Sequence, residues 1–326
     1  MPPPSSRVAR IDVLLLLMTL IWGTNYAIVK HAFTEMDPQA FNALRMIVAS
    51  ATFAGVIGWA HVRGARRPAG EAPGDGAGSI VSVFHTRERL TAKEWMGLAA
   101  LGIVGQCLYQ YCFVAGLSQT SVANSALLVG ITPVLIAITS AVSGRDPVGW
   151  GHWAGAALSI AGIYIVVGGG ATVSGSSLRG DLTMIVAVVC WTIYTLGSGP
   201  LMRRHSPVGV TGLSMIIGSM LYVPLVWSHL RTIDTDAVSA GTWFSIVYSA
   251  LTALCVAYTI WYAAVRAIGS ARTSIYSNLV PVVAMMTAVL FLGESLGVRK
   301  LIGAAAVLAG IALTRVGAGK LTAPAE

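Results

Sequence analysis

The side chains best suited to chemistry in this sequence are amides and aromatic rings that lie within long apolar stretches. One set follows the helical spacing i, i+3, i+4, i+7: Gln106, Tyr109, Gln110 and Phe113. Residues at this spacing share one face of an α-helix. Amides form hydrogen bonds and aromatic rings stack on flat or cationic groups. This face therefore predicts ligand binding.

Other apolar stretches carry comparable side chains. Trp22 lies ten residues after Asp12. That separation corresponds to about 15 Å along a helix, which is near the middle of a bilayer rather than in an interfacial aromatic belt. For Trp22 and its counterpart Trp191, cavity lining and packing between helices remain equally open. Buried amides in lipid need partners, so binding is favoured for Asn25 and Gln106. The candidate cavity residues are Trp22, Asn25, Tyr26, Gln106, Tyr109, Gln110, Trp191, Tyr194, Tyr258, Trp261, Tyr262, Tyr276 and Asn278.

Three charged residues add to these candidates. Arg45 lies within an apolar stretch, where it either binds an anionic ligand group or stabilises the structure by capping helix ends or pairing with Glu35. The structural role is favoured because Arg45 is within snorkelling reach of the interface. Lys30 and Glu294 fall at expected helix ends, where interfacial anchoring is the simpler interpretation. All three therefore count as candidates for anion binding or for a structural charge.

The remaining polar residues and the prolines limit the chemistry further. No Asp, Glu or His falls near the middle of an apolar stretch, so a carboxylate-based proton relay is not indicated. The four cysteines lie within apolar stretches and are interpreted as packing residues, so we expect neither a metal site nor a cofactor. Pro133 and Pro281 are expected to kink their helices and to free backbone carbonyls inside the membrane.

The elements that position these residues are expected to be transmembrane helices in a lipid bilayer. Of the 326 residues, 55% are hydrophobic and only 10% are charged. A soluble domain carries about 25% charged residues to wet its surface. The net charge of +8 does not indicate nucleic-acid binding, because the basic residues lie between the apolar stretches rather than on one face.

A span needs roughly 20 apolar residues. We expect ten spans, at residues 12–32, 38–61, 95–117, 123–143, 151–170, 181–202, 209–230, 243–267, 273–292 and 299–317.

The basic residues are distributed unevenly between the two ends of these spans. With the N-terminus inside, the cytoplasmic segments hold 15 Lys and Arg residues and the outer segments hold 5. Cytoplasmic loops carry such an excess. The sequence therefore predicts a multi-pass protein of the inner membrane with both termini in the cytoplasm. Residues 62–94, rich in Gly, Ala and Pro, are expected to form a flexible cytoplasmic loop. The sequence defines no oligomeric state and is compatible with a monomer.

The chain also repeats itself. Trp22 and Trp191 lie 169 residues apart, and the same shift aligns the first and second spans with the sixth and seventh. After the 62–94 loop the shift becomes 148, which aligns Pro133 with Pro281. Because each copy contains five spans, an odd number, the second copy enters the membrane upside down. Transporters use inverted repeats to exchange inward-open and outward-open states. We expect a terminal segment at 1–11, a first repeat at 12–170, an inverted repeat at 171–317 and a tail at 318–326.

A series of short motifs runs in order along nearly the whole chain. They are Trp22-Gly23-Thr24-Asn25-Tyr26 followed by Lys30, then Arg45, Pro133, Gly180-Asp181, Cys190-Trp191-Thr192-Ile193-Tyr194, Ser277-Asn278-Leu279-Val280-Pro281, Leu292-Gly293-Glu294, Leu301-Ile302-Gly303-Ala304 and Gly310-Ile311. In order and spacing they resemble the drug/metabolite transporter (DMT) superfamily, EamA branch. The resemblance implies an all-α membrane fold of ten helices, a central cavity between the halves and export or exchange of metabolites. It implies no particular substrate.

These observations together predict a transporter of a small polar or amphipathic metabolite that works by alternating access. An aromatic and amide lining suits neutral, zwitterionic or aromatic solutes. Amino acids are the first candidate substrates and cationic drugs the second. An integral membrane enzyme is the alternative from another class, but it would need a cluster of acids, bases or metal ligands at one interface, and the sequence contains none.

Overall fold

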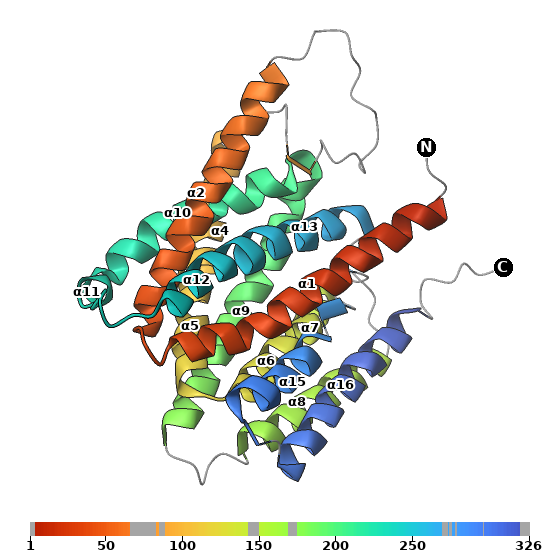
Figure 1. Cartoon of the computed structure of the whole chain (residues 1–326). Coiled ribbons are helices and arrows are strands. Elements are labelled where there is room, and N and C mark those ends of the chain that lie inside the picture. Colours follow the sequence, from red (N-terminus) through yellow and green to blue (C-terminus); the bar gives the residue numbers. More distant parts are fainter. Residues whose placement is uncertain are drawn as a thin grey trace, which may run out of the picture.

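A computed structural model of the chain describes residues 4–65, 83–84, 89–142, 150–168, 175–268, 273, 276–277, 279–295 and 297–319. All regular secondary structure in these ranges is helical. The helices pack against one another as a bundle, and in the view of Figure 1 α1 begins and α16 ends on the same side of it. The expected site residue Asn278 lies outside the described residues.

The helices follow the expected order of apolar stretches. The first are α1 (Pro4–Ala32), α2 (Pro38–Ala65), α4 (Ala92–Leu101), the π-helix η1 (Gly102–Leu108), α5 (Tyr109–Gln119), α6 (Val122–Gly130), α7 (Thr132–Val142) and α8 (Trp150–Gly168). The remainder are α9 (Gly175–Arg204), α10 (Pro207–Leu225), α11 (Trp227–Arg231), α12 (Ala240–Ser249), the π-helix η2 (Ala250–Val256), α13 (Ala257–Ile268), α15 (Leu279–Leu292) and α16 (Val298–Gly319).

Six helical segments of the described chain are long and apolar enough to cross a membrane. They are Ile11–Ala32, Pro38–Val62, Ala92–Gln119, Leu178–Arg204, Pro207–Leu225 and Ala240–Ile268. Shorter apolar helices lie at Val122–Ile136, Trp153–Gly162 and Leu279–Leu292. Several helices extend past the expected span ends. For example, α1 begins at Pro4 rather than at residue 12, and α2 continues to Ala65 into the segment expected to be a loop.

Local sequence signals account for several helix starts. Thr91 precedes α4 and accepts a hydrogen bond from the backbone of Glu94, whose side chain bonds back to Thr91, so the two form a capping box. Ser206 caps α10 in the same manner, and Pro207 follows it at the first helical position, where a missing N–H costs nothing. Ser239 caps α12. These caps satisfy backbone donors that the helices leave without a partner.

Two long segments contain a π-helical stretch in the middle. η1 joins α4 to α5, and η2 joins α12 to α13, with seven residues in each. In a π-helix the backbone bonds run from i to i+5, so the side chains after it face a direction that a continuous α-helix would not give them. Such stretches are frequently found at functional sites.

Small residues let several helix pairs approach closely. α8 packs against α16, α5 against α9, α1 against α15, and α2 against α10. A Cβ atom at Gly162 of α8 would lie 2.7 Å from the backbone nitrogen of Val307 in α16, so no larger residue fits there. Between α2 and α10 the hydroxyl oxygens of Ser50 and Ser219 lie 2.7 Å apart. Close contact through Gly and Ser is typical of helices packed inside membranes.

Candidate functional site

A cavity of about 770 Å³, mouth included, lies between the helices. Its walls come from α1, α2, α5, α6, α7, α9, η2, α13 and α15, together with Ser277. The lining residues are Trp22, Asn25, Tyr26, Arg45, Tyr109, Gln110, Phe113, Ala126, Val129, Gly130, Thr132, Ile136, Trp191, Ala253, Leu254, Tyr258, Trp261, Ser277, Val280 and Pro281.

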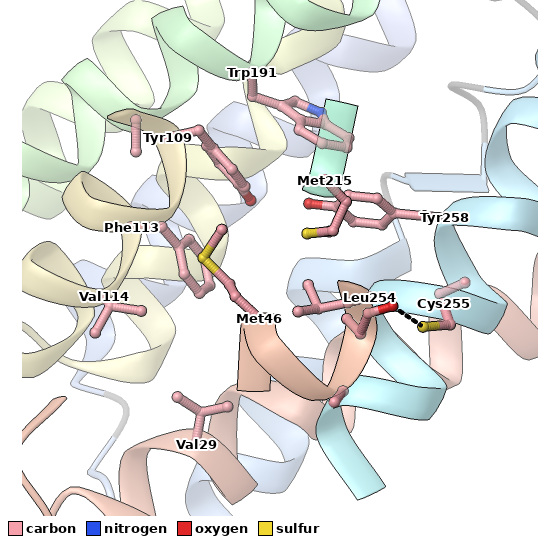
Figure 2. Packing of buried hydrophobic residues seen from close by; sticks show 14 of the residues in the cluster. Val29, Met46, Tyr109, Phe113, Val114, Trp191, Met215, Leu254, Cys255 and Tyr258 are labelled. Atoms are coloured by element: carbon pink, nitrogen blue, oxygen red, sulfur yellow. Dashed lines mark hydrogen bonds between the residues drawn. The ribbon is translucent and has the colours of Figure 1, made fainter. Parts of the chain in front are cut away.

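Aromatic rings from four segments form one side of the cavity. The ring centres of Trp191 and Tyr109 lie 5.1 Å apart, and those of Trp191 and Tyr258 lie 5.3 Å apart. Trp22 meets Trp261 at 5.6 Å. Figure 2 shows Tyr109, Trp191 and Tyr258 around a common space, with the two tyrosine hydroxyl groups pointing toward each other. Ring faces placed in this way can stack on a flat or cationic group of a ligand. We refer to Trp22, Tyr109, Trp191, Tyr258 and Trp261 as the aromatic box.

The backbone of η2 holds one ring of the box in place. The indole nitrogen of Trp22 donates a hydrogen bond of 3.1 Å to the carbonyl oxygen of Ala253, which lies in η2. Both residues line the cavity. The orientation of the Trp22 ring therefore depends on the irregular stretch of helix opposite it.

A hydrogen-bond network centred on Arg45 forms another part of the wall. Nη1 of Arg45 donates to Oγ of Ser249 at 3.0 Å, and Ser249 in turn donates to the side-chain oxygen of Asn25. Nη2 of Arg45 donates to Asn42 at 2.8 Å and to Gln110 at 3.2 Å. The network joins α1, α2, α5 and α12, and Arg45 is only 1% exposed.

The expected pairing of Arg45 with Glu35 is wrong. The Glu35 carboxylate accepts hydrogen bonds from the backbone nitrogen of Ser239 at 2.9 Å and from the hydroxyl of Thr242 at 2.8 Å. These hydrogen bonds hold the pKa of the Glu35 carboxyl below its usual range. Arg45 instead points into the bundle interior, where neutral side chains of its own helix and of two neighbouring helices accept its protons.

Eight of the expected cavity residues line the cavity, but Gln106 does not. It is fully buried against α10, and a Cβ atom added to Gly218 would lie 2.3 Å from Cβ of Gln106. The helical spacing predicted that Gln106 shares a face with Tyr109 and Gln110. That argument assumed a continuous α-helix, whereas Gln106 lies in the π-helix η1 and packs against Gly218 of α10 instead of lining the cavity.

Three further candidates lie beside the cavity rather than in its wall. The Tyr194 hydroxyl lies 2.9 Å from that of Ser214, and the Tyr194 ring packs edge-on against that of Tyr262. Tyr276 donates to the Asp12 carboxylate at 2.7 Å. Pro133 is the second residue of α7, after a break in the helix at Ile131, and Pro281 lines the cavity near the start of α15.

Sequence reasoning missed several lining residues. Arg45 was a candidate for anion binding, but a structural role was favoured for it, whereas it lines the cavity. Ser277 carried no signal beyond its place in a family motif. The lining residues with small or aliphatic side chains, such as Val129 and Leu254, resemble the many others that face lipid or neighbouring helices, so spacing alone could not select them.

Lys30 and Glu294 cap the two helices that meet at the α5–α6 connection. Nζ of Lys30 donates to the carbonyl oxygens of Leu117, Ser118 and Thr120 at 2.7–3.0 Å, at the C-terminus of α5. The Glu294 carboxylate accepts from the backbone nitrogens of Val122 and Ala123 at the N-terminus of α6. A cation at the end of one helix and an anion at the start of the next both match the helix dipoles. Lys30 and Glu294 therefore have a structural role as helix caps.

Together, the long apolar helices and the cavity between them define a multi-pass membrane protein with a site for a small molecule. The EamA-like transporter family model matches residues 9–72, 76–168 and 178–316. The chain therefore belongs to the EamA-like transporter family of the drug/metabolite type, and it is a membrane transporter. Family and relatives point to transport rather than catalysis.

Known proteins similar to the chain include curated transporters. An uncharacterized transporter from Archaeoglobus fulgidus is 26% identical over 94% of this chain and 97% of its own length. A probable terminal-alkyne amino-acid exporter from Streptantibioticus cattleyicolor is 26% identical, with 92% of this chain and 91% of the relative covered. A protein of known crystal structure shares the fold, with a TM-score of 0.63 at 18% identity over 95% of this chain and 98% of the other.

Proposed function

We propose that the chain exports a small amphipathic metabolite, with amino acids as first candidates, by alternating access between two inverted five-helix halves. In this proposal the halves comprise residues 12–170 and 171–317, ten helices cross the inner membrane, and both termini lie in the cytoplasm. The observation that supports it most is that residues 169 or 148 positions apart make equivalent contacts between the two halves, two such pairs in the wall of the cavity itself.

The contact between α2 and α10 is reciprocal. Ser50 and Ser219 lie 169 residues apart, as do Met46 and Met215. Oγ of Ser50 donates to the carbonyl oxygen of Met215, and Oγ of Ser219 donates to that of Met46. Reciprocal contacts of this kind arise at a twofold axis, since each partner then sees the same surroundings. The pair therefore supports a pseudo-twofold axis between the halves.

The contact between α8 and α16 supports the same axis. Cβ atoms added at Gly162 and Gly310, which lie 148 residues apart, would meet Gly303 and Gly155 respectively. These two partners are also 148 residues apart. Since later residues of one helix meet earlier residues of the other, the two helices run antiparallel. An antiparallel arrangement of equivalent helices supports inverted rather than parallel halves.

The cavity lies where this axis would pass. Trp22 and Trp191 are 169 residues apart and their ring centres lie 6.0 Å apart. Gln110 and Tyr258 are 148 residues apart, and the Gln110 amide donates to the Tyr258 hydroxyl at 3.4 Å. A site on the axis is bounded by equivalent elements of both halves, so rocking one half against the other can open it to either side.

The aromatic box supports an amphipathic substrate, because it offers ring faces next to hydrogen-bonding groups. A relative is named a probable terminal-alkyne amino-acid exporter, which supports amino acids as the first class to test. Efflux from proteoliposomes preloaded with labelled amino acids is the direct assay. We expect at least one amino acid to leave faster than from protein-free liposomes, and Trp191→Ala to abolish the difference. Equal rates for all amino acids with and without protein would contradict the proposal.

A further inference from the structure

Arg45 is a buried cation without a counter-charge. Its hydrogen bonds go to the neutral oxygens of Ser249, Asn42 and Gln110, and its guanidinium lies 6.0 Å from the centre of the Phe41 ring. Within the described residues it makes no ion pair. A charge removed from water is unfavourable unless it is paired, so a permanent cation at 1% exposure calls for an explanation.

The acidic side chains that the structure describes are engaged or exposed elsewhere. Asp12 accepts from Tyr276, Glu35 from Ser239 and Thr242, Asp37 from Gln39 and Ala40, Asp181 from Thr120 and Asn124, Glu94 from Thr91 and Arg204, and Glu294 from Val122 and Ala123. Asp234 and Asp236 lie exposed between α11 and α12. The described chain therefore supplies no anion for Arg45.

The fold does not require a cation at this position. The residue 169 positions after Arg45 is Ser214, which forms a neutral hydrogen bond with Tyr194. Ser214 is fully buried, as Arg45 nearly is. A neutral hydroxyl therefore suffices at the equivalent place in α10, and the charge belongs to one side of the cavity only.

Two donors among the lining residues also have no acceptor. Nε of Arg45 and the indole nitrogen of Trp261 are buried without a hydrogen-bond partner in the part of the chain that the structure describes. Both residues line the cavity, and both are at least 98% buried. Buried donors are almost always paired in folded proteins. Two unpaired donors around one cavity therefore favour a ligand that brings acceptor oxygens.

We propose that Arg45 binds a carboxylate group of the substrate, with the Trp261 indole as a second donor. The substrate class is then an organic monocarboxylate, zwitterionic amino acids included, whose apolar or aromatic body lies in the aromatic box. A carboxylate supplies the missing negative charge, and its two oxygens match the fork of a guanidinium group. Amines without a carboxylate are disfavoured because their charge repels that of Arg45. This inference rests on the proposed function in taking the cavity as the transport site.

Four matched probes separate the chemical groups. They are L-phenylalanine, 3-phenylpropionate, L-phenylalaninamide and 2-phenylethylamine, which share a phenyl ring and differ in carrying the carboxylate, the amine or both. Binding to the purified full chain in detergent is followed by tryptophan fluorescence, since Trp22 and Trp191 line the cavity. We expect the two carboxylates to bind about 10- to 100-fold more tightly than the amide and the amine, the range of hydrogen bonds to a charged group.

Substitutions of Arg45 test whether this residue causes the preference for carboxylates. Arg45→Gln should remove the preference for carboxylates, and Arg45→Lys should restore part of it because the charge returns without the fork. Ser50→Ala, a change at a half-buried residue of the same helix away from the cavity wall, should leave it unchanged. The wild-type preference among the four probes needs no variant, so it tests the inference even if Arg45→Gln misfolds.

Three results would overturn the inference. They are equal binding of amines and carboxylates by the wild type, no binding of either carboxylate, and an unchanged preference in a folded Arg45→Gln variant. Binding and transport can fail separately. If the carboxylates bind as expected but no amino acid leaves proteoliposomes, the proposed function fails while the carboxylate site stands.

Discussion

Replacing Lys30 by Met should destabilise the protein without changing its cavity wall. The Lys30 ammonium group donates to three carbonyl oxygens at the end of α5, at 2.7, 3.0 and 2.9 Å. Met retains most of the apolar stem but leaves these acceptors without their cation. A hydrogen bond to a charged group contributes about 1.5–3 kcal/mol when buried, and a cation at a helix C-terminus about 0.3–1 kcal/mol more. The three bonds share one ammonium group and the site is partly exposed, so we discount their sum for solvent screening to roughly 2–3 kcal/mol.

This loss should be visible in thermal unfolding of the purified protein in detergent. At about 2–4 °C per kcal/mol, the melting temperature of Lys30→Met should fall by roughly 4–12 °C. Lys93→Met is a matched control, because Lys93 is exposed in the first turn of α4 and its loss removes the same charge. A Lys30→Met variant that melts within about 1 °C of the control would show that water replaces the ammonium group, and the capping argument would be wrong.

Three further predictions concern binding, topology and coupling. Trp22→Ala should weaken binding of the transported solute by about tenfold through loss of a stacking surface, whereas Gln106→Ala and the exposed Trp153→Ala should change it less than about twofold; equal effects in fluorescence titrations would contradict the site. Reporter fusions after Arg204 should be cytoplasmic and fusions near Asp234 periplasmic, and the reverse pattern would contradict the proposed orientation. Because no span carries a midplane carboxylate, transport in proteoliposomes should survive collapse of the proton gradient. Accumulation above equilibrium driven by an imposed pH gradient would refute this.

The sequence predicted most of the helical architecture, because a membrane imposes a strong constraint on it. Every backbone group in lipid must find a partner within the chain, so long apolar stretches become helices. Six of the ten expected spans agree in order and in approximate position with described helices that are long and apolar enough to cross a membrane. Helix ends were less accurate. Pro4 and Ala65 extend their helices beyond the apolar core, where water also tolerates a helix and hydropathy gives no signal.

Much of the candidate site was also predictable, because polar and aromatic side chains are rare in lipid-facing positions. Trp22, Tyr109 and Tyr258 line the cavity as expected. The failures have physical causes. Gln106 was misplaced because the spacing argument assumed an unbroken α-helix. The capping roles of Lys30 and Glu294 were missed because their partners lie 87 and 172 residues away in the chain, so only the folded structure brings them together.

The two π-helical stretches make the length of the chain, and not only its composition, a determinant of the cavity. η1 precedes Tyr109 and Gln110, and η2 precedes Tyr258 and Trp261. Each residue of an α-helix advances by about 100° around the axis. If either stretch adopted regular α-helical geometry at unchanged length, the lining residues that follow it would turn away from the cavity, while their identities stayed the same. A one-residue deletion inside the stretch, by contrast, would let it relax to an α-helix and keep those residues near their present face. One-residue insertions next to η1 or η2 should accordingly be tolerated less well than one-residue deletions within them.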